Sequence, residues 1–232
     1  MTSWGRPADL LERMDDPDCD RRTLERTYAR FGLVNRLVAG WRRVYRERIR
    51  PLLAVAPAPA RLLDLGCGGG DVLRALLAWA ARDGFAVDAL GVDPDPRAIA
   101  WATRRPQLPH LRFRRAASAD LVAEGSRYDL VLSNHVLHHL TPAERAALFA
   151  DSTRLADRVA IHSDIRRSRL GYALYAVGAA PLSPGTFLLA DGLTSIRRSL
   201  TPTELAAELP DGWRVETHGT FRLLAVREGD AA

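Results

Sequence analysis

The stretch that most constrains the fold runs from Leu62 to Asp71, where an apolar segment leads directly into a glycine-rich turn. Residues 66 to 70 include four glycines, which is more than a tight turn requires. In an open α/β sheet, ligands bind at the carboxyl ends of the strands, where glycine lets the bare backbone approach them closely. The amides that open the following helix can satisfy polar ligand atoms as well. The turn therefore predicts a ligand site at the end of the first strand of a parallel sheet.

The residue after the glycines narrows the class of ligand. The dinucleotide fingerprint GxGxxG would need glycine at positions 66, 68 and 71, and position 71 is an aspartate. A carboxylate at that place would be repelled by a pyrophosphate. A nicotinamide or flavin enzyme is therefore the less favoured interpretation.

Asp64, Gly66, Gly68 and Gly70 instead form a DxGxGxG pattern, and here the sequence resembles the class I S-adenosylmethionine-dependent methyltransferases. The resemblance implies that S-adenosyl-L-methionine is the cofactor and that this loop, Cys67 included, wraps its methionine part. It also implies that the carboxylate of Asp64 helps to orient the ammonium group of that cofactor.

A second acidic position follows the next strand-like run, residues 87–92. Asp93 ends this run, where a carboxylate can accept hydrogen bonds from both ribose hydroxyls. With Pro94 beside it, Asp93 resembles the second motif of the family. Asp95 is a rival for the same role, although its position better suits a helix N-cap.

Two further motifs follow in the order that the family shows. The resemblance implies that Asp120 accepts a hydrogen bond from the adenine amino group and that Leu121 covers the ring, with a surface turn as the alternative for this pair. Residues 128–140 resemble the fourth motif, a buried strand that ends in polar residues beside the sulfonium centre. Asn134 is the first of these polar residues and completes the expected cofactor site.

The histidines after the fourth strand are the candidates for catalysis. His135 is the first candidate for a general base or a substrate orienter and His138 the second, because one helical turn would place both imidazoles on one face. His139 is expected to turn into packing, and the alternative is that all three are structural. Their spacing could also suit a metal ion, but no carboxylate accompanies them in the sequence, so we predict no metal.

A fifth strand-like run leads to further polar residues at the same edge of the predicted sheet. Asp164 is a candidate to face the substrate. Arg166 and Arg167 either cap a helix or recognise a substrate carboxylate, and both roles stay open.

Apolar runs alternate with helical stretches from residue 61 to residue 162, which is the rhythm of parallel βαβ units. The last two runs, 215–218 and 222–226, have hairpin spacing. These patterns and the resemblance predict a Rossmann-like α/β fold, with a mostly parallel seven-stranded sheet and an antiparallel C-terminal hairpin. We expect residues 1–55 to form an N-terminal helical lid and residues 61–232 the methyltransferase domain. Between them, Pro51 and residues 55–60 form a connector that is expected to end the helix.

The mostly apolar segment from Leu170 to Leu193 has two interpretations. It forms either a lid or wall of an apolar substrate pocket, or plain core. Glycine and proline interrupt it too often for a span of the bilayer.

The net charge of +5 does not require a polyanionic partner. All 33 basic residues are arginine, which together with the abundance of alanine indicates a GC-rich genome. The fourth motif also lacks the two prolines that nucleic-acid amino methyltransferases usually carry, so we predict no nucleic-acid partner. Two cysteines are too few for a disulfide framework, and the first 50 residues are dense in charge. We therefore expect a cytoplasmic protein that has no membrane partner.

The resemblance and the apolar segment together predict a small hydrophobic acceptor for the methyl group. We expect a phenolic hydroxyl of an aromatic or polyketide-like metabolite, because a histidine base suits phenol activation. An amine or a ring carbon is the second choice, and a cofactor-binding subunit without turnover is a rival of another class. A homodimer is a candidate assembly.

Overall fold

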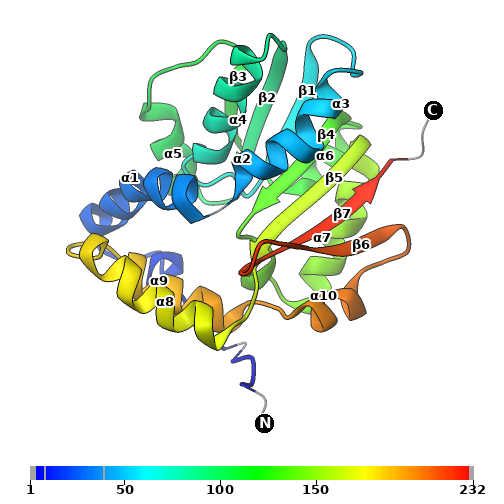
Figure 1. Ribbon diagram of the computed structural model, residues 1–232. Helices are drawn as coiled ribbons and strands as arrows, with labels where there is room; N and C mark the ends of the chain where they lie inside the picture. Colours follow the sequence, from blue (N-terminus) through cyan, green and yellow to red (C-terminus); the bar gives the residue numbers. More distant parts are fainter. Residues whose placement is uncertain (1–3, 8, 39, 230–232) are drawn as a thin grey trace.

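The computed structural model describes residues 4–7, 9–38 and 40–229, including the side chains of all of these except residues 33–38. Seven strands form one sheet in the order β3-β2-β1-β4-β5-β7-β6 (Figure 1). The strands are β1 Ala60–Leu65, β2 Val87–Asp93, β3 Leu111–Arg115, β4 Tyr128–Asn134, β5 Ala156–Ile165, β6 Trp213–His218 and β7 Arg222–Glu228.

The strand directions confirm the predicted Rossmann-like fold. Strands β1 to β5 run parallel, and β7 pairs antiparallel with both β5 and β6. Only residues 219–221 separate β6 from β7, which is too short for the crossover that a parallel pair needs. Because β7 lies next to β5, Arg222 at its start is the register partner of Ile165 at the end of β5.

Helices cover both faces of the sheet, and alternate strand residues supply the two cores. Leu62 of β1 packs into the core under α4 (Asp71–Arg82), whereas Leu63 packs into the core under α7 (Pro142–Leu155). This alternation is the period of two that a strand imposes on its side chains. Three shorter helices, α5 Pro96–Arg104, α6 Ser118–Ala123 and α10 Pro202–Glu208, complete the layers.

The N-terminal region divides into two parts that pack against different regions of the protein. The first part comprises η1 (Arg13–Asp15) and α1 (Arg21–Val38). Asp20 acts as the N-cap of α1, because its side chain accepts a hydrogen bond from the Thr23 amide at 2.8 Å. The second part comprises α2 (Trp41–Val44), η2 (Tyr45–Ile49) and α3 (Arg50–Leu53), and it packs into the main core. Of the residues 1–55 expected to form a lid, those from Trp41 to Leu53 thus belong to the main core, and a lid formed by the earlier residues stays a prediction.

The expected connector also begins later than the sequence indicates. The helix continues through Pro51 to Leu53, so the prediction that proline ends it there is wrong. The preceding turn is a π-helix in which the Arg50 amide reaches back to the carbonyl of Tyr45. Pro51 itself lies in the first turn of α3, where a helix does not need the amide that proline lacks.

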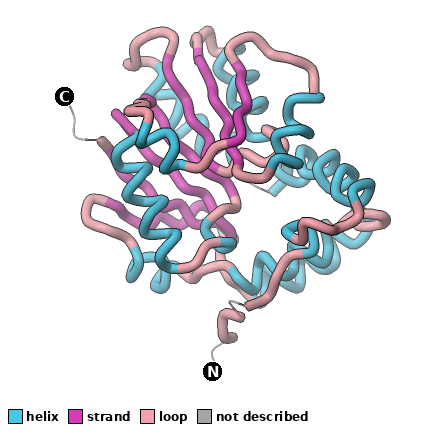
Figure 2. The backbone as a smooth tube through the Cα atoms, turned by 180° about the vertical axis from the view of Figure 1, so that it is seen from behind, coloured by secondary structure: helices cyan, strands magenta, loops and turns pink. Residues whose placement is uncertain are grey.

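The segment after β5 forms two helices that stand away from the sheet. They are α8 (Arg169–Ala179) and α9 (Leu188–Arg198), joined through η4 (Ala180–Leu182), and they lie opposite α1 (Figures 1 and 2). In the described residues, no helix combines the length and the apolarity that a membrane crossing would take.

Candidate functional site

A cavity of about 820 Å³ opens at the carboxyl ends of the parallel strands. The loops after β1, β2, β4 and β5 form its floor, and α1, η1, α8 and α9 form its walls. Of the two interpretations of the apolar segment, the structure therefore supports the wall of a pocket. Side chains such as Leu174, Ala179, Leu182 and Leu188 supply its apolar surface.

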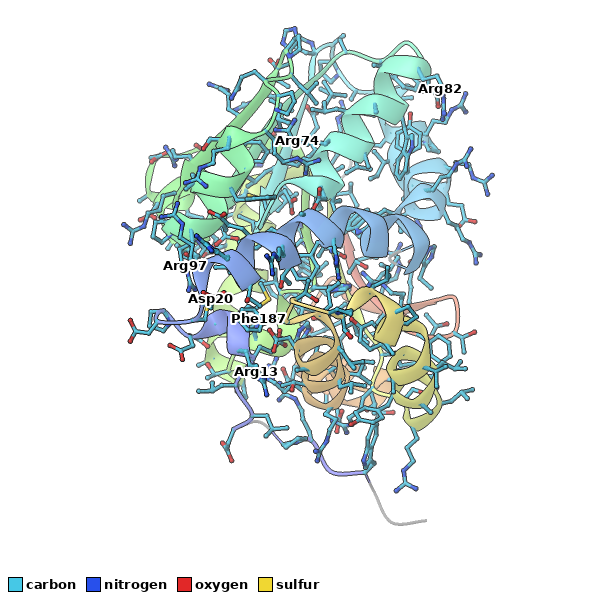
Figure 3. The ribbon with its side chains drawn as sticks, turned by 90° about the vertical axis from the view of Figure 1, so that its left-hand side faces the viewer. Arg13, Asp20, Arg74, Arg82, Arg97 and Phe187 are labelled. Atoms are coloured by element: carbon cyan, nitrogen blue, oxygen red, sulfur yellow. The ribbon has the colours of Figure 1, made fainter. Side chains whose placement is uncertain are left out.

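The N-terminal segment is held over this cavity by hydrogen bonds to α9. The Asp191 carboxylate accepts from the amides of Arg13 and Met14 at 2.9 and 3.0 Å. The Phe187 amide donates to Thr27 Oγ1 of α1 at 2.9 Å. Arg13 and Phe187, which take part in these contacts, are labelled in Figure 3. On the other side, Tyr28 of α1 stacks on Trp101 of α5. The segment thus borders the cavity, and its role as a lid stays a prediction.

The glycine loop has the backbone conformations that its sequence predicts. Gly66, Gly68 and Gly70 have φ angles of 71°, 51° and 74°, which side-chain-bearing residues rarely adopt. A Cβ on Gly66 would lie 2.6 Å from Cγ2 of Val136, whereas a Cβ on Gly68 would meet nothing within 4 Å. Gly66 is thus required for packing, and Gly68 leaves open space on the cavity side of the loop.

Asp64 is a buried carboxylate in the cavity wall, and one of its oxygens lacks a hydrogen-bond partner among the described residues. Its side chain is 1% exposed, and its Oδ1 atom has no hydrogen-bond partner among the described residues. Burial and the charge of Asp93 raise its pKa well above the ordinary value. A carboxylate in this state fits a cationic or hydrogen-donating ligand group, since such a group would offset its desolvation.

Asp93 links the glycine loop to the next strand. Its two oxygens accept hydrogen bonds from the amides of Gly68 and Asp95, both at 2.9 Å. Asp95 is the N-cap of α5, because its side chain accepts from the Arg97 amide at 2.7 Å. The structure thus places Asp93 and Pro94 in the cavity wall and gives Asp95 the capping role.

Asp120 and Leu121 do not line the cavity. The Asp120 carboxylate accepts from the Ala117 amide at 2.8 Å and so closes the first turn of α6. Leu121 is 1% exposed and packs into the core. The adenine contacts expected of this pair therefore stay a prediction, which the capping by Asp120 and the burial of Leu121 do not support.

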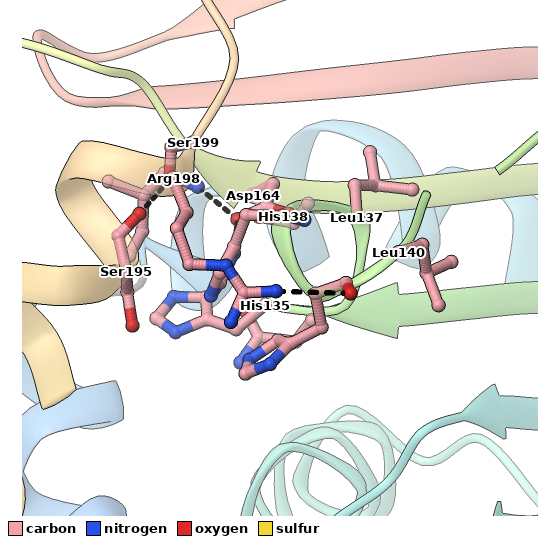
Figure 4. Close-up of polar contacts among 12 residues, drawn as sticks. His135, Leu137, His138, Leu140, Asp164, Ser195, Arg198 and Ser199 are labelled. Carbon is pink, nitrogen blue, oxygen red and sulfur yellow. Dashed lines mark hydrogen bonds and ion pairs between the residues drawn. The ribbon is translucent and has the colours of Figure 1, made fainter. Parts of the chain in front are cut away.

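His138 lines the cavity and lies between two carboxylates. Its Nδ1 atom is 2.7 Å from Oδ1 of Asp164, and both residues are labelled in Figure 4. Its Nε2 atom is 3.4 Å from Oε1 of Glu12, and the side chain is 1% exposed. Burial alone would lower its pKa, but the charge of Asp164, the hydrogen bond to Asp164 and the nearby Glu12 carboxylate raise the pKa to about 9. At neutral pH His138 is protonated and is not available as a general base. Asp164 is likewise occupied and does not face the cavity.

His135 is held by Arg222 at the start of β7. It has a φ of 62°, which is uncommon for a residue other than glycine, and its amide donates to the carbonyl of Ser163 at 2.9 Å. The Nη1 atom of Arg222 contacts His135 Nε2. Burial and the charge of Arg222 lower the pKa of His135 well below its ordinary value. The nitrogen nearest to Arg222 is therefore a hydrogen-bond acceptor and not a free base.

Glu12 lies beside His138 and His139 and offers the carboxylate that a metal site there would need. The expectation that no carboxylate accompanies the histidines is wrong, because ligand atoms of Glu12, His138 and His139 all lie within 4.8 Å of one another. Such a group could hold a metal ion, and the proton on His138 stabilises the same arrangement without one. The absence of a metal stays a prediction.

The His138 network predicts a pH-dependent stability. A pKa raised to about 9 means that the stabilisation is fully present below the unfolded value of about 6.5 and is lost as the pH rises through 9. Asp164 has the opposite sign, since its lowered pKa gives a stabilisation that is lost in acid. We expect the free energy of unfolding, measured in urea, to fall between pH 7 and pH 9.5. A flat profile over this range would contradict the ion pair.

Several residues that line or hold the site could not be predicted from the sequence. Glu12 and Asp191 have no motif around them and reach the cavity only through the path of the chain. Arg222 directly precedes the apolar run 223–226 of β7, which is a local signal that could have marked it. Trp41 donates from Nε1 to Oδ1 of Asn134 at 2.9 Å, so that a residue of the predicted lid fixes the end of β4.

The comparison with protein families settles the class of this chain. A family model described as a methyltransferase domain matches residues 38–177. This chain belongs to the methyltransferase-domain family. The match confirms the resemblance to the class I S-adenosylmethionine-dependent methyltransferases.

Curated relatives of this methyltransferase-domain chain include enzymes that act on small molecules. It is 31% identical over 163 residues to ubiquinone biosynthesis O-methyltransferase of Azorhizobium caulinodans, and this alignment covers 69% of this chain and 59% of that relative. It is 40% identical over 110 residues to trans-aconitate 2-methyltransferase of Methylobacterium nodulans, covering 44% of this chain and 40% of that relative. The methyltransferase-domain chain therefore spans less than two thirds of the length of either relative.

Solved structures share the fold of this methyltransferase-domain chain at low identity. Magnesium protoporphyrin IX methyltransferase from Synechocystis PCC 6803 with bound SAH aligns with a TM-score of 0.55 and 20% identity, covering 82% of this chain and 84% of that one. A plantazolicin methyltransferase in complex with a triazolic analog and SAH aligns with a TM-score of 0.60 and 14% identity, covering 90% and 96%. These similarities support the fold.

Proposed function

We propose that this protein transfers a methyl group from S-adenosylmethionine to a small hydrophobic acceptor, with a phenolic hydroxyl as the group that is methylated. The observation that carries the proposal is one cavity in which the glycine loop, Asp64 and Asp93 meet the apolar wall of α8 and α9. The acidic side fits a cofactor with an ammonium group and ribose hydroxyls. The apolar side fits an aromatic acceptor.

The residues at the acidic side suit the separate parts of this cofactor. Asp64, buried without a partner for Oδ1, would hold the ammonium group, and Asp93 would accept from the ribose hydroxyls. Cys67, Pro94 and Asn134 line the same part of the cavity. When bound, the cofactor supplies an electrophilic methyl group on a sulfonium.

The choice of a phenolic oxygen rests on the similarity to ubiquinone biosynthesis O-methyltransferase. The roles of the histidines follow from their contacts. His135 lines the cavity and would orient the acceptor together with Arg222, whereas His138 would act as a positioning residue through its bond to Asp164. The methyl transfer itself needs alignment more than acid catalysis, and the buried walls would exclude water during it.

Two measurements test the proposed function. Calorimetric titration should show binding of S-adenosylhomocysteine (SAH) and no binding of NADH, and binding of NADH alone would overturn the cofactor. Incubation with labelled S-adenosylmethionine and a panel of phenols, anilines and carboxylic acids should then label a phenol. Cofactor binding without transfer to any member of a broad panel would favour a subunit that binds the cofactor without turnover.

A glycine pair tests the position of the cofactor in the loop. Gly68 and Gly84 both have positive φ, and a Cβ on either would meet nothing within 4 Å. Alanine at each position should therefore cost a similar stability, roughly 1–2 kcal/mol. Only Gly68→Ala places a methyl group in the cavity, and we expect a roughly tenfold or larger loss of SAH affinity for it alone. Equal SAH affinities of Gly68→Ala and Gly84→Ala would contradict the proposed site.

A further inference from the structure

Arg222 is a buried cation in the wall of the cavity whose hydrogen-bond partners are all neutral. Its side chain is 7% exposed. Its Nη2 atom donates to Oδ1 of Asn134 and to Oγ of Ser163, both at 2.7 Å, and Nη1 contacts His135 Nε2. Its Nε atom has no partner among the described residues. The guanidinium is thus fixed in place, yet its charge is not balanced by these contacts.

Other buried arginines of this protein have a carboxylate beside them. Arg145, which is fully buried, makes a two-point contact with Glu208, and Arg198 lies 3.8 Å from Asp15. Within residues 4–7, 9–38 and 40–229, no carboxylate lies at ion-pair distance from Arg222. Asp164 acts on it from farther away, but the oxygens of Asp164 already accept from His138. A buried charge without a partner is costly, so its retention in a cavity wall points to a ligand that supplies the anion.

The guanidinium lies where an acceptor would meet the cofactor. Its side chain starts on β7, passes Ser163 of β5 and reaches Asn134 at the end of β4. Strand β4 is the direct neighbour of β1, which ends in the glycine loop, and neighbouring strands are about 4.8 Å apart. Next to Arg222 the cavity is lined by Ile165 and Phe221, which are apolar. This part of the cavity therefore suits an apolar body that carries a negative oxygen.

The neighbours of Arg222 keep its charge unbalanced. His135 stays neutral because burial and Arg222 lower its pKa, so it neither adds charge nor removes it. Burial lowers the pKa of Arg222 only to about 10, which leaves it protonated at neutral pH. The charge of His138, another cation of the described cavity lining, is balanced by Asp164 and Glu12. The remaining arginine of that lining is Arg166, which is half-buried and follows β5.

We propose that Arg222 is the counter-ion of the acceptor, so that the acceptor binds in the cavity as an oxyanion, either a phenolate or a carboxylate. This inference rests on the proposed function and makes Arg222 a specificity-determining residue. The acceptor loses its proton to solvent before it binds. Its oxygen then forms a bond to the methyl carbon, the bond between that carbon and the sulfonium sulfur breaks, and SAH leaves as a neutral thioether. No histidine base is needed, in agreement with the contacts of His135 and His138.

Binding of matched anionic and neutral probes to the SAH-saturated protein tests this inference. The pairs are benzoate with benzamide and 4-nitrophenol with 4-nitroaniline, measured by calorimetry at pH 8. We expect the wild-type protein to bind at least one anion at least tenfold more tightly than its neutral partner. Arg222→Gln should bring this ratio close to one, and Arg222→Lys should retain part of it. The pair with the larger ratio tells a carboxylate acceptor from a phenolate acceptor.

Arg166→Gln is the matched control, because it removes the other arginine of the described cavity lining. It should keep the tenfold preference for the anion. A preference that disappears in Arg166→Gln and persists in Arg222→Gln would overturn the proposal, as would equal or absent binding of both anions by the wild-type protein. If Arg222→Gln does not fold, the wild-type ratios and Arg222→Lys still decide the question. SAH affinity should stay within threefold of the wild-type value in all folded variants. A wild-type protein that does not bind SAH would contradict the proposed function rather than the role of Arg222.

Discussion

Asp93→Ala is expected to lower the affinity for SAH at least 100-fold while the protein stays folded. The carboxylate of Asp93 holds the Gly68 amide in place and, in the proposed complex, accepts from the ribose hydroxyls. A hydrogen bond to a charged group contributes about 1.5–3 kcal/mol, so the loss of two of them would cost about 3–6 kcal/mol. Each 1.4 kcal/mol corresponds to a factor of ten in the dissociation constant. Calorimetric titration of SAH measures the effect directly.

Asp88 provides a control on the same strand. It lies in β2, five residues before Asp93, and its side chain, which is 41% exposed, pairs with His110 at 2.6 Å. Asp88→Ala should therefore leave SAH affinity within twofold of the wild-type value. If Asp93→Ala were folded and bound SAH as Asp88→Ala does, Asp93 would have no part in the cofactor site.

His138→Leu is expected to cost about 3–5 kcal/mol of the free energy of unfolding, the range for removing one partner of a buried ion pair. The substitution removes the cation between Asp164 and Glu12 and leaves two buried carboxylates without it. Because the leucine cannot titrate, the fall in stability between pH 7 and pH 9.5 should disappear as well. Urea unfolding at several pH values measures both effects.

His139→Leu is the matched control for this substitution. The neighbouring imidazole is half-buried and pairs with Asp15 at 3.1 Å, and a partly exposed pair contributes about 1 kcal/mol or less. Its loss should therefore be small, and the slope with pH should persist. Equal losses for the two variants would show that His138 is not the centre of a buried network.

The sequence by itself determines the glycine loop, the alternation of strands and helices, and the position of Asp93. These features are local, because positive φ at Gly66 needs glycine and a carboxylate that ends a strand reaches the adjacent loop. The C-terminal hairpin is local in the same sense, since three residues between two strands permit only an antiparallel return. Such features could therefore be predicted without knowing which distant segments meet.

The tertiary structure decides what the polar side chains do. His138 is a candidate base in the sequence and a protonated partner in the structure, because Glu12 and Asp164 come from segments 126 and 26 residues away. In the sequence nothing distinguishes the role of Arg222 from that of the other arginines. In the structure, β7 lies beside β5, and this placement brings Arg222 into contact with His135. Burial and neighbouring charge set the protonation of a side chain, and both depend on long-range packing that no local pattern encodes. The glycine loop thus predicts a place for the cofactor, whereas only the fold shows which groups around it are free to act.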